Sequence, residues 1–190
     1  ALADVQEQRF EYYLKVNGAT HENVLAALRD WINAASKVPS RGNSESANST
    51  RERLSDAVAT IEEAYLIRLN QQPEDTAMAL RRIAFELRQV KLLDDAERVL
   101  KNLVERQSEH FGRQDAETLR SLMELAFLYK IVPRSEEAVK LFREIWSEAG
   151  SVWGPDARDT LAAGNQLAVV LRQQGKLEEA ATLAGTVLER

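Results

Sequence analysis

The feature that most constrains this chain is a stretch of sequence that recurs at a spacing of 42 residues. The segment 112–119 aligns without gaps on the segment 154–161, and counting backward by the same spacing gives a third copy from about Gln72. One motif that all three copies share is Asp94-Asp95-Ala96, Glu136-Glu137-Ala138 and Glu178-Glu179-Ala180. Self-similarity at a period near 40 residues is typical of an array of tandem helical repeats.

Each copy has the hydrophobic pattern of two helices separated by a short break. The first helix opens near an acidic residue followed by Thr, and the second opens on the acidic pair. The break carries Lys91, Pro133 or Gly175, of which only Pro133 and Gly175 are strong helix interrupters. Small residues recur on both helices, where they let two helix axes approach closely; they are Ala84, Ala126 and Ala168 on the first, and Ala96, Ala138 and Ala180 on the second. We therefore expect an all-α, right-handed superhelical solenoid of antiparallel helix hairpins, without β-sheet.

The first 50 residues do not follow the repeat. Periodic apolar positions predict helices over 4–17 and 22–36. The segment Val38–Thr50 is polar, lacks periodicity and contains both Pro39 and Gly42, so we interpret it as a mobile loop, with a helix resuming near Arg51. The expected organisation is a divergent N-terminal helical hairpin at 1–37, the polar loop at 38–50, and a repeat array at 51–190 with regular units from about residue 72.

Composition narrows the function classes. The 190 residues include no cysteine, which excludes disulfides, thiolate metal sites and a cysteine nucleophile, and favours a reducing, cytoplasmic location. The net charge of −5 argues against a general nucleic-acid binder, and no apolar run is long enough to span a membrane. Because the sequence begins without Met and stops directly after a helical pattern, we expect it to be a piece of a longer protein.

Motifs for catalysis are lacking in the sequence. The glycines never fall in a nucleotide-binding spacing, and His21 and His110 have no second histidine at metal-ligand spacing. The acidic pairs could be mistaken for general acid–base dyads, but each recurs in the first turn of a helix, where it stabilises the positive end of the helix dipole. We expect no enzymatic activity, no catalytic residues, no metal and no cofactor.

The repeat resembles a known family. A large apolar residue followed by Ala in the first helix, and Glu-Glu-Ala in the second, is similar to the tetratricopeptide repeat. The 42-residue length, and Gly-Pro-Asp-x-x-Asp-Thr-Leu at 154–161 leading into Asn165-Gln166-Leu167-Ala168, looks like the kinesin-light-chain variant of that family. The resemblance covers 72–190 well, extends loosely to 51–70, and matches residues 1–50 poorly.

The resemblance implies a concave groove, lined by the first helix of each unit, that binds an extended or helical peptide. Carried over residue by residue, the groove positions are Met78, Arg81, Phe85 and Arg88, then Arg120, Met123, Phe127 and Lys130, then Ala162, Asn165, Val169 and Arg172. Five are cations and none is acidic, and Phe85, Phe127 and Val169 form an apolar stripe at one equivalent place. Either the groove is a basic, partly aromatic binding surface, or the Phe side chains are ordinary inter-helix packing and the cations a solvated face.

Two classes of function remain open. In the first, the chain is a protein–protein interaction scaffold whose groove captures an acidic or acidic–apolar peptide segment, from a partner protein or from its own parent chain, and binds neither nucleic acid nor membrane. In the second, it is a structural or oligomerisation solenoid that self-associates through its C-terminal helix, where Leu177 and Leu188 are among the apolar residues without an evident cover. A regulatory array of a larger enzyme or signalling protein is a further alternative.

Overall fold

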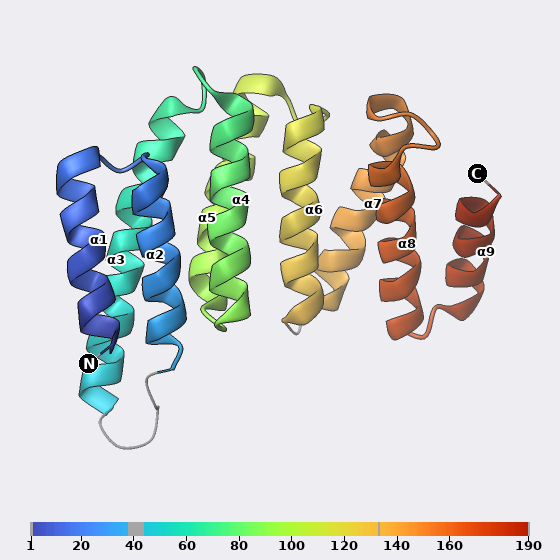
Figure 1. Ribbon diagram of the computed structural model, residues 1–190. Coiled ribbons are helices and arrows are strands. Elements are labelled where there is room, and N and C mark those ends of the chain that lie inside the picture. The colour runs from blue at the N-terminus through green and yellow to red at the C-terminus, as the bar shows by residue number, and fades with distance from the viewer. Residues whose placement is uncertain (1, 38–43, 133, 190) are drawn as a thin grey trace. The chain divides into compact units, whose positions relative to one another are not determined.

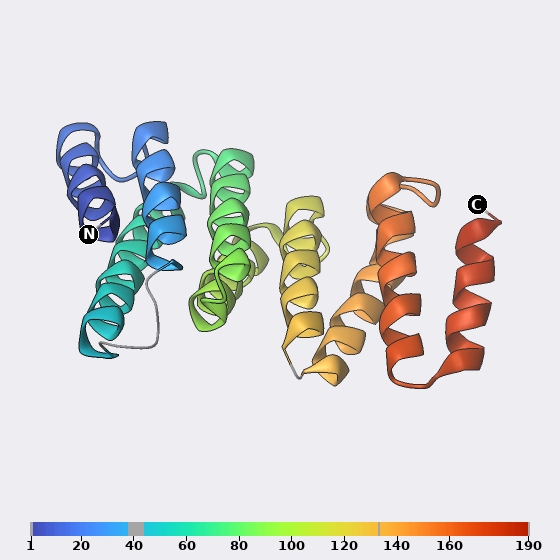
Figure 2. The same ribbon diagram turned by 60° about the horizontal axis from the view of Figure 1, so that its bottom comes forward.

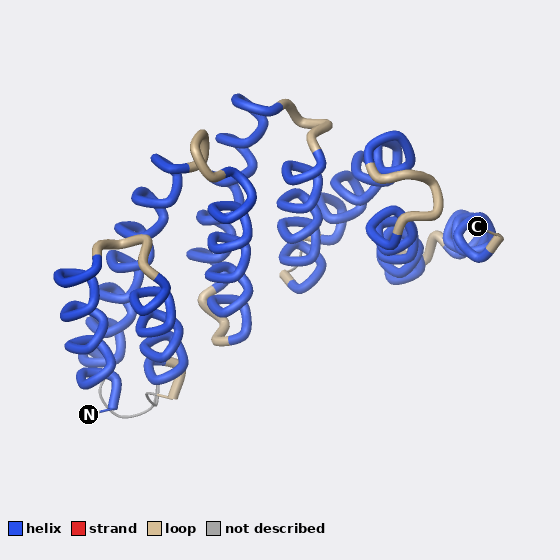
Figure 3. The backbone as a smooth tube through the Cα atoms, turned by 45° about the horizontal axis from the view of Figure 1, so that its top comes forward, coloured by secondary structure: helices blue, strands red, loops and turns tan. Residues whose placement is uncertain are grey.

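The computed structural model describes residues 2–37, 44–132 and 134–189, and within these ranges the chain forms nine α-helices and no β-strand (Figures 1 and 3). The helices are α1 Leu2–Asn17, α2 Glu22–Ala35, α3 Ser44–Arg68, α4 Pro73–Gln89, α5 Leu93–Phe111, α6 Ala116–Ile131, α7 Ser135–Val152, α8 Arg158–Gln173 and α9 Leu177–Leu188. The all-α prediction is confirmed, and so are the helices expected at 4–17 and 22–36.

The chain divides into two compact units, Ala1–Val99 and Leu100–Arg190, and the division falls inside α5. In the first unit α3 lies behind α1 and α2 (Figure 1), and α4 packs against both α2 and α3. In the second unit α6, α7 and α8 each pack against the helix that follows, and successive helices from α6 to α9 run in opposite directions (Figure 2).

Backbone geometry repeats with the sequence. Gly112 and Gly154, which end the second helices α5 and α7, have φ of 90° and 97°. The break at Lys91, the one without a strong interrupter, is confirmed: Lys91 has φ 65° where its equivalent Gly175 has φ 77°. Both breaks close with the same bond across the helix end, from Leu92 N–H to the Leu87 carbonyl at 2.9 Å and from Lys176 N–H to the Leu171 carbonyl at 3.0 Å. Lys91 therefore occupies a left-handed helix-ending position that normally favours glycine.

The recurring small residues lie in the core. All six alanines named above are buried, and so are the larger residues Leu87, Tyr129 and Leu171. One site departs from the repeat: Gly164 of α8 takes the place that Leu122 has in α6, and Trp146 of α7 takes the place of Val104. A Cβ at Gly164 would lie 2.5 Å from the Trp146 ring, so the glycine makes room for the indole.

The acidic pairs lie in the first turns of α5, α7 and α9, as expected for stabilisation of the helix dipole. Asp95 has an additional role, because it accepts hydrogen bonds from Ser55 Oγ at 2.6 Å and from Arg98 at 3.0 Å. Arg98 also pairs with the buried carboxylate of Glu62, and so joins α5 to α3 within the first unit.

The start of α3 corrects the expected loop. Residues 38–43 lie outside the described residues, but residues 44–50, also predicted to be loop, are the first turns of α3, which begins at Ser44 rather than near Arg51. The physical reason is that this part of the segment holds neither Pro nor Gly, and adding turns to an existing helix costs far less than nucleating one. Thr50, at the end of the mispredicted stretch, is buried.

The extended α3 holds the α1–α2 hairpin at two places. Arg53 Nη1 donates to Glu7 Oε2 of α1 at 2.5 Å. Toward the other end of α3, Tyr65 Oη donates to the Thr20 carbonyl at 3.1 Å, and Arg68 donates to the Thr20 hydroxyl. Glu7 is buried, and burial raises the pKa of its carboxyl despite the neighbouring Arg53 charge.

Candidate functional site

In the first unit, the predicted groove positions on α4 present an apolar surface beside cations. Met78 and Phe85 are 61% and 45% exposed, and they lie seven residues apart on one face of the helix. Arg81 and Arg88 are partly exposed, and the Arg88 guanidinium lies 5.1 Å from the centre of the Phe85 ring. An exposed aromatic residue on a helix is informative because most large aromatic side chains are buried.

In the second unit, α6 repeats this pairing with a more buried ring. The ammonium group of Lys130 lies 6.0 Å from the centre of the Phe127 ring and donates to Gln166 Oε1 of α8 at 2.8 Å. The Phe127 ring packs edge-on against Phe142 of α7, with their centroids 5.5 Å apart. Phe127 is therefore partly an inter-helix packing residue, whereas Phe85 is the more accessible member of the apolar stripe.

Arg120 is held by acidic residues that the sequence argument did not place beside it. Its Nε donates to Asp159 of α8 at 2.9 Å, and its Nη1 pairs with Glu117. The guanidinium also lies 5.8 Å from the Trp153 ring centre. Burial opposes the charge, but the hydrogen bonds to Asp159 and Glu117 prevail and raise the pKa of Arg120. The surface of α6 is therefore less positive than a count of its own groove residues indicates.

The remaining positions divide between core and surface. Met123 is buried, so little of its side chain is accessible to a partner. On α8, Asn165, Val169 and Arg172 come together along a hollow of about 420 Å³ that they share with the small residues of α9, namely Ala180, Ala181 and Ala184. Ala162 is half-buried on the same helix.

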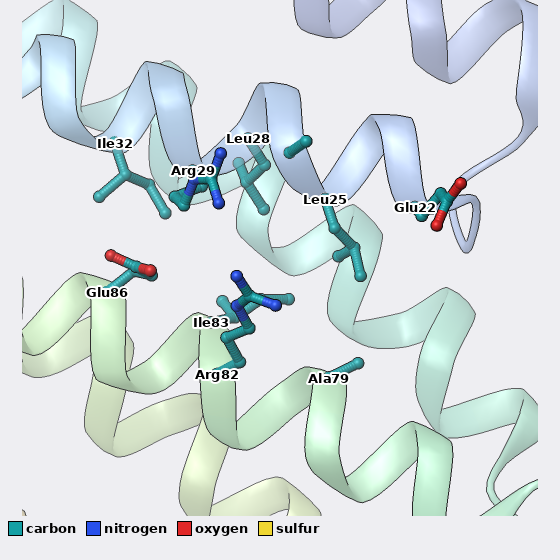
Figure 4. A pocket seen from close by; sticks show the side chains of 10 residues that line it. Glu22, Leu25, Leu28, Arg29, Ile32, Ala79, Arg82, Ile83 and Glu86 are labelled. Atoms are coloured by element: carbon teal, nitrogen blue, oxygen red, sulfur yellow. The ribbon is translucent and has the colours of Figure 1, made fainter.

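A pocket that the sequence argument missed lies between α2 and α4 (Figure 4). Its volume is about 200 Å³. Leu28, Ile32 and Ile83 are its buried apolar residues, and charged side chains from both helices surround them. The turn before α2 is like the turn before α6: His21 N–H donates to the Gly18 carbonyl at 3.3 Å, as Asp115 N–H does to the Gly112 carbonyl. The 42-residue spacing does not reveal this similarity, because α2 precedes the polar insertion.

Metal-ligand clusters and membrane-spanning helices have no counterpart in the part of the chain that the structure describes. There, no three or more His, Cys, Asp or Glu side chains gather as metal ligands would. Of the helices over 2–37, 44–132 and 134–189, none combines the length and apolar character that crossing a membrane requires.

These hairpins and small-residue contacts define a helical-repeat fold. Residues 160–190 match the family model described as tetratricopeptide repeat. No curated protein sequence matches the chain. The chain is thus similar to the tetratricopeptide repeat over residues 160–190, and its fold is like that of kinesin-light-chain repeats.

Solved structures support the same fold. The nearly identical TPR-like repeats ascribed to a kinesin light chain of Podosopora anserina share 18% identity over 98% of this chain and 84% of that one, with a TM-score of 0.62. BtubC (BKLC) from P. vanneervenii shares 12% identity over 99% of this chain and 71% of that one, with a TM-score of 0.58. These two likenesses show the fold of the chain, a solenoid of helical hairpins.

Proposed function

We propose that this chain is a non-catalytic, cytoplasmic scaffold that binds an acidic or acidic–apolar segment of a partner protein on its first helices. One observation carries the proposal: a cation lies over the ring of an exposed or half-exposed Phe at the same position of two repeats, Arg88 over Phe85 and Lys130 over Phe127. Each unit thus has its own binding surface, on α4 in the first and on α6 and α8 in the second.

The pairing of ring and cation favours a particular kind of peptide. The cation holds the ring in place and puts positive charge beside exposed apolar area. An apolar side chain next to a carboxylate can therefore contact the ring and the cation together, whereas a purely acidic peptide uses only the cation. Arg172 beside Val169 continues the same chemistry on α8 without an aromatic ring.

The test is a titration of the chain with a fluorescein-labelled peptide in which phenylalanine and leucine alternate with glutamate, followed by fluorescence anisotropy. Phe85→Ala should weaken binding by more than about 1 kcal/mol, the threshold for a consequential interface residue. Ile67→Ala is the matched control, since Ile67 is 73% exposed but lies on α3. Phe85 is preferred to Phe127 because truncating Phe127 also removes its contact with Phe142.

Charge provides a second arm of the same experiment. Affinity should fall with added salt, and replacing each glutamate of the peptide with lysine should abolish binding, because the surface cations then repel it. Equal affinity of the wild-type chain and Phe85→Ala for the acidic–apolar peptide refutes the proposal.

Self-association is a second candidate function, favoured by the exposed apolar residues of α9. Leu177 and Leu188 are 62% and 86% exposed, and Leu177 borders the hollow shared with α8. Sedimentation velocity over a range of concentrations checks it: the wild-type chain should sediment faster as concentration rises, and Leu177→Glu should remain monomeric. A concentration-independent monomer excludes it.

A further inference from the structure

The pocket between α2 and α4 has an apolar floor and two arginines in its lining. Leu28, Ile32 and Ile83 form the floor. Arg82 of α4 directs its guanidinium group into the space between the two helices, and Arg29 of α2, whose guanidinium lies against α2, also lines the pocket (Figure 4). An aliphatic side chain on this floor would therefore lie close to positive charge.

The two arginines are incompletely neutralised. Arg82 is exposed and forms no ion pair with the residues that the structure describes. Arg29 is 3.4 Å from Asp30, its neighbour in sequence, but Asp30 is also held by Arg9 at the shorter distance of 3.0 Å. Two like charges that line one apolar-floored pocket repel each other, and an anion between them removes the repulsion. The planar guanidinium groups match the two oxygens of a carboxylate.

The other charged residues of the pocket limit how much acid it accepts. Glu22 lies at one end of the pocket, near the start of α2, and Glu86 rises from α4 at the other end, opposite Ile32 (Figure 4). These carboxylates repel further acidic groups on either side of a bound anion. The charge pattern is thus negative, positive, negative along the pocket, and it fits one carboxylate flanked by apolar residues better than an acidic run.

We propose that the α2–α4 pocket binds a single Glu or Asp side chain of a partner peptide between Arg29 and Arg82, with a neighbouring aliphatic side chain on the Leu28, Ile32 and Ile83 floor. This inference rests on the proposed function and deepens it, because it assigns the acidic residue of the peptide to positions outside the predicted groove. It also gives α2, the divergent first helix, a direct part in recognition.

The experiment uses three fluorescein-labelled peptides, acetylated and amidated so that their termini carry no charge. Their cores are a glutamate between two leucines, a glutamine between two leucines, and three glutamates. The wild-type chain should bind the single-glutamate peptide about tenfold more tightly than the glutamine peptide, the usual value of a hydrogen bond to a charged group. The three-glutamate peptide should bind more weakly than the single-glutamate peptide.

Arg29→Gln and Arg82→Gln should each remove most of the preference for glutamate over glutamine. Arg51→Gln on α3, outside the pocket, is the control with the same change of charge and should leave the preference intact. Circular dichroism checks that all variants remain helical. Equal loss in Arg51→Gln, no loss in the pocket variants, or tightest binding of the three-glutamate peptide overturns the pocket assignment. Phe85→Ala separates the two proposals, since it weakens all three peptides if the first-helix surface binds them, whatever the pocket does.

Discussion

Replacing Gly164 with alanine tests whether the second unit depends on a close contact that only glycine allows. Gly164 lies inside α8, where alanine is ordinarily the better helix former by about 1 kcal/mol. Helix propensity alone therefore predicts that Gly164→Ala raises the free energy of unfolding.

The packing predicts the opposite sign. The new Cβ would lie 2.5 Å from Trp146 Cζ3, 2.6 Å from Val187 Cγ2 and 2.9 Å from Trp146 Cε3. The indole is rigid and Val187 is buried, so neither can move aside without disturbing the contact between α7, α8 and α9. Overpacking of this kind costs about 1–3 kcal/mol, which exceeds the propensity gain. We expect Gly164→Ala to lower the free energy of unfolding by about 1 kcal/mol after the two effects are combined.

Urea denaturation followed by circular dichroism measures this difference. Gly150→Ala is the control, because Gly150 lies in α7 and a Cβ there would meet nothing within 4 Å; it should be neutral or stabilising by about 0.5 kcal/mol. The preceding repeat supplies a rescue: Val104 and Leu122 occupy the places of Trp146 and Gly164, so Trp146→Val should restore much of the stability that Gly164→Leu removes. If Gly164→Ala stabilises the chain as much as Gly150→Ala does, the close-contact argument is wrong.

Two further tests concern the equivalent turns at Lys91 and Gly175 and the Arg98–Glu62 ion pair of the first unit. Lys91→Gly should raise the free energy of unfolding by about 0.5–1 kcal/mol because Lys91 has a positive φ, and Gly175→Ala should lower it by a similar amount. The same urea assay measures both changes. Changes of the same sign would contradict the equivalence of the two turns. Arg98→Met should lower the free energy of unfolding by about 2 kcal/mol or more, because it leaves the buried carboxylate of Glu62 without its Arg98 partner. Arg98→Met/Glu62→Leu should recover most of that loss in a double-mutant cycle, and an additive result would show that the ion pair is unimportant.

The sequence sufficed to predict the repeat, but it did not predict the side-chain contacts between neighbouring helices. The 42-residue spacing placed Lys91 and Gly175 at equivalent turns, and the structure gives both the same left-handed backbone, because the helix end itself dictates that geometry. It could not place Asp159 beside Arg120, since repeat phase identifies the face of one helix but not which side chain of the next helix reaches across to it.

The sequence was limited in the same way for the predicted groove and for the α2–α4 pocket. Met123 shares a helix position with the partly exposed Arg81, yet it is buried, because neighbouring side chains rather than helix phase decide its exposure. The α2–α4 pocket was missed because α2 precedes an insertion that interrupts the spacing. The start of α3 was missed because a polar segment without periodic apolar residues carries no signal that distinguishes an extended helix from a loop.

The contacts between α3 and the α1–α2 hairpin bear on the order in which the chain folds and opens. They join residues 45–48 positions apart, whereas the side-chain hydrogen bonds between helices of the second unit join residues 11–39 apart. A contact between more distant residues closes a longer loop, so it forms later in folding. Helices α1 to α3 are thus fastened as one block, and their amide hydrogens should exchange with solvent together, whereas the last hairpin of the array can open by itself.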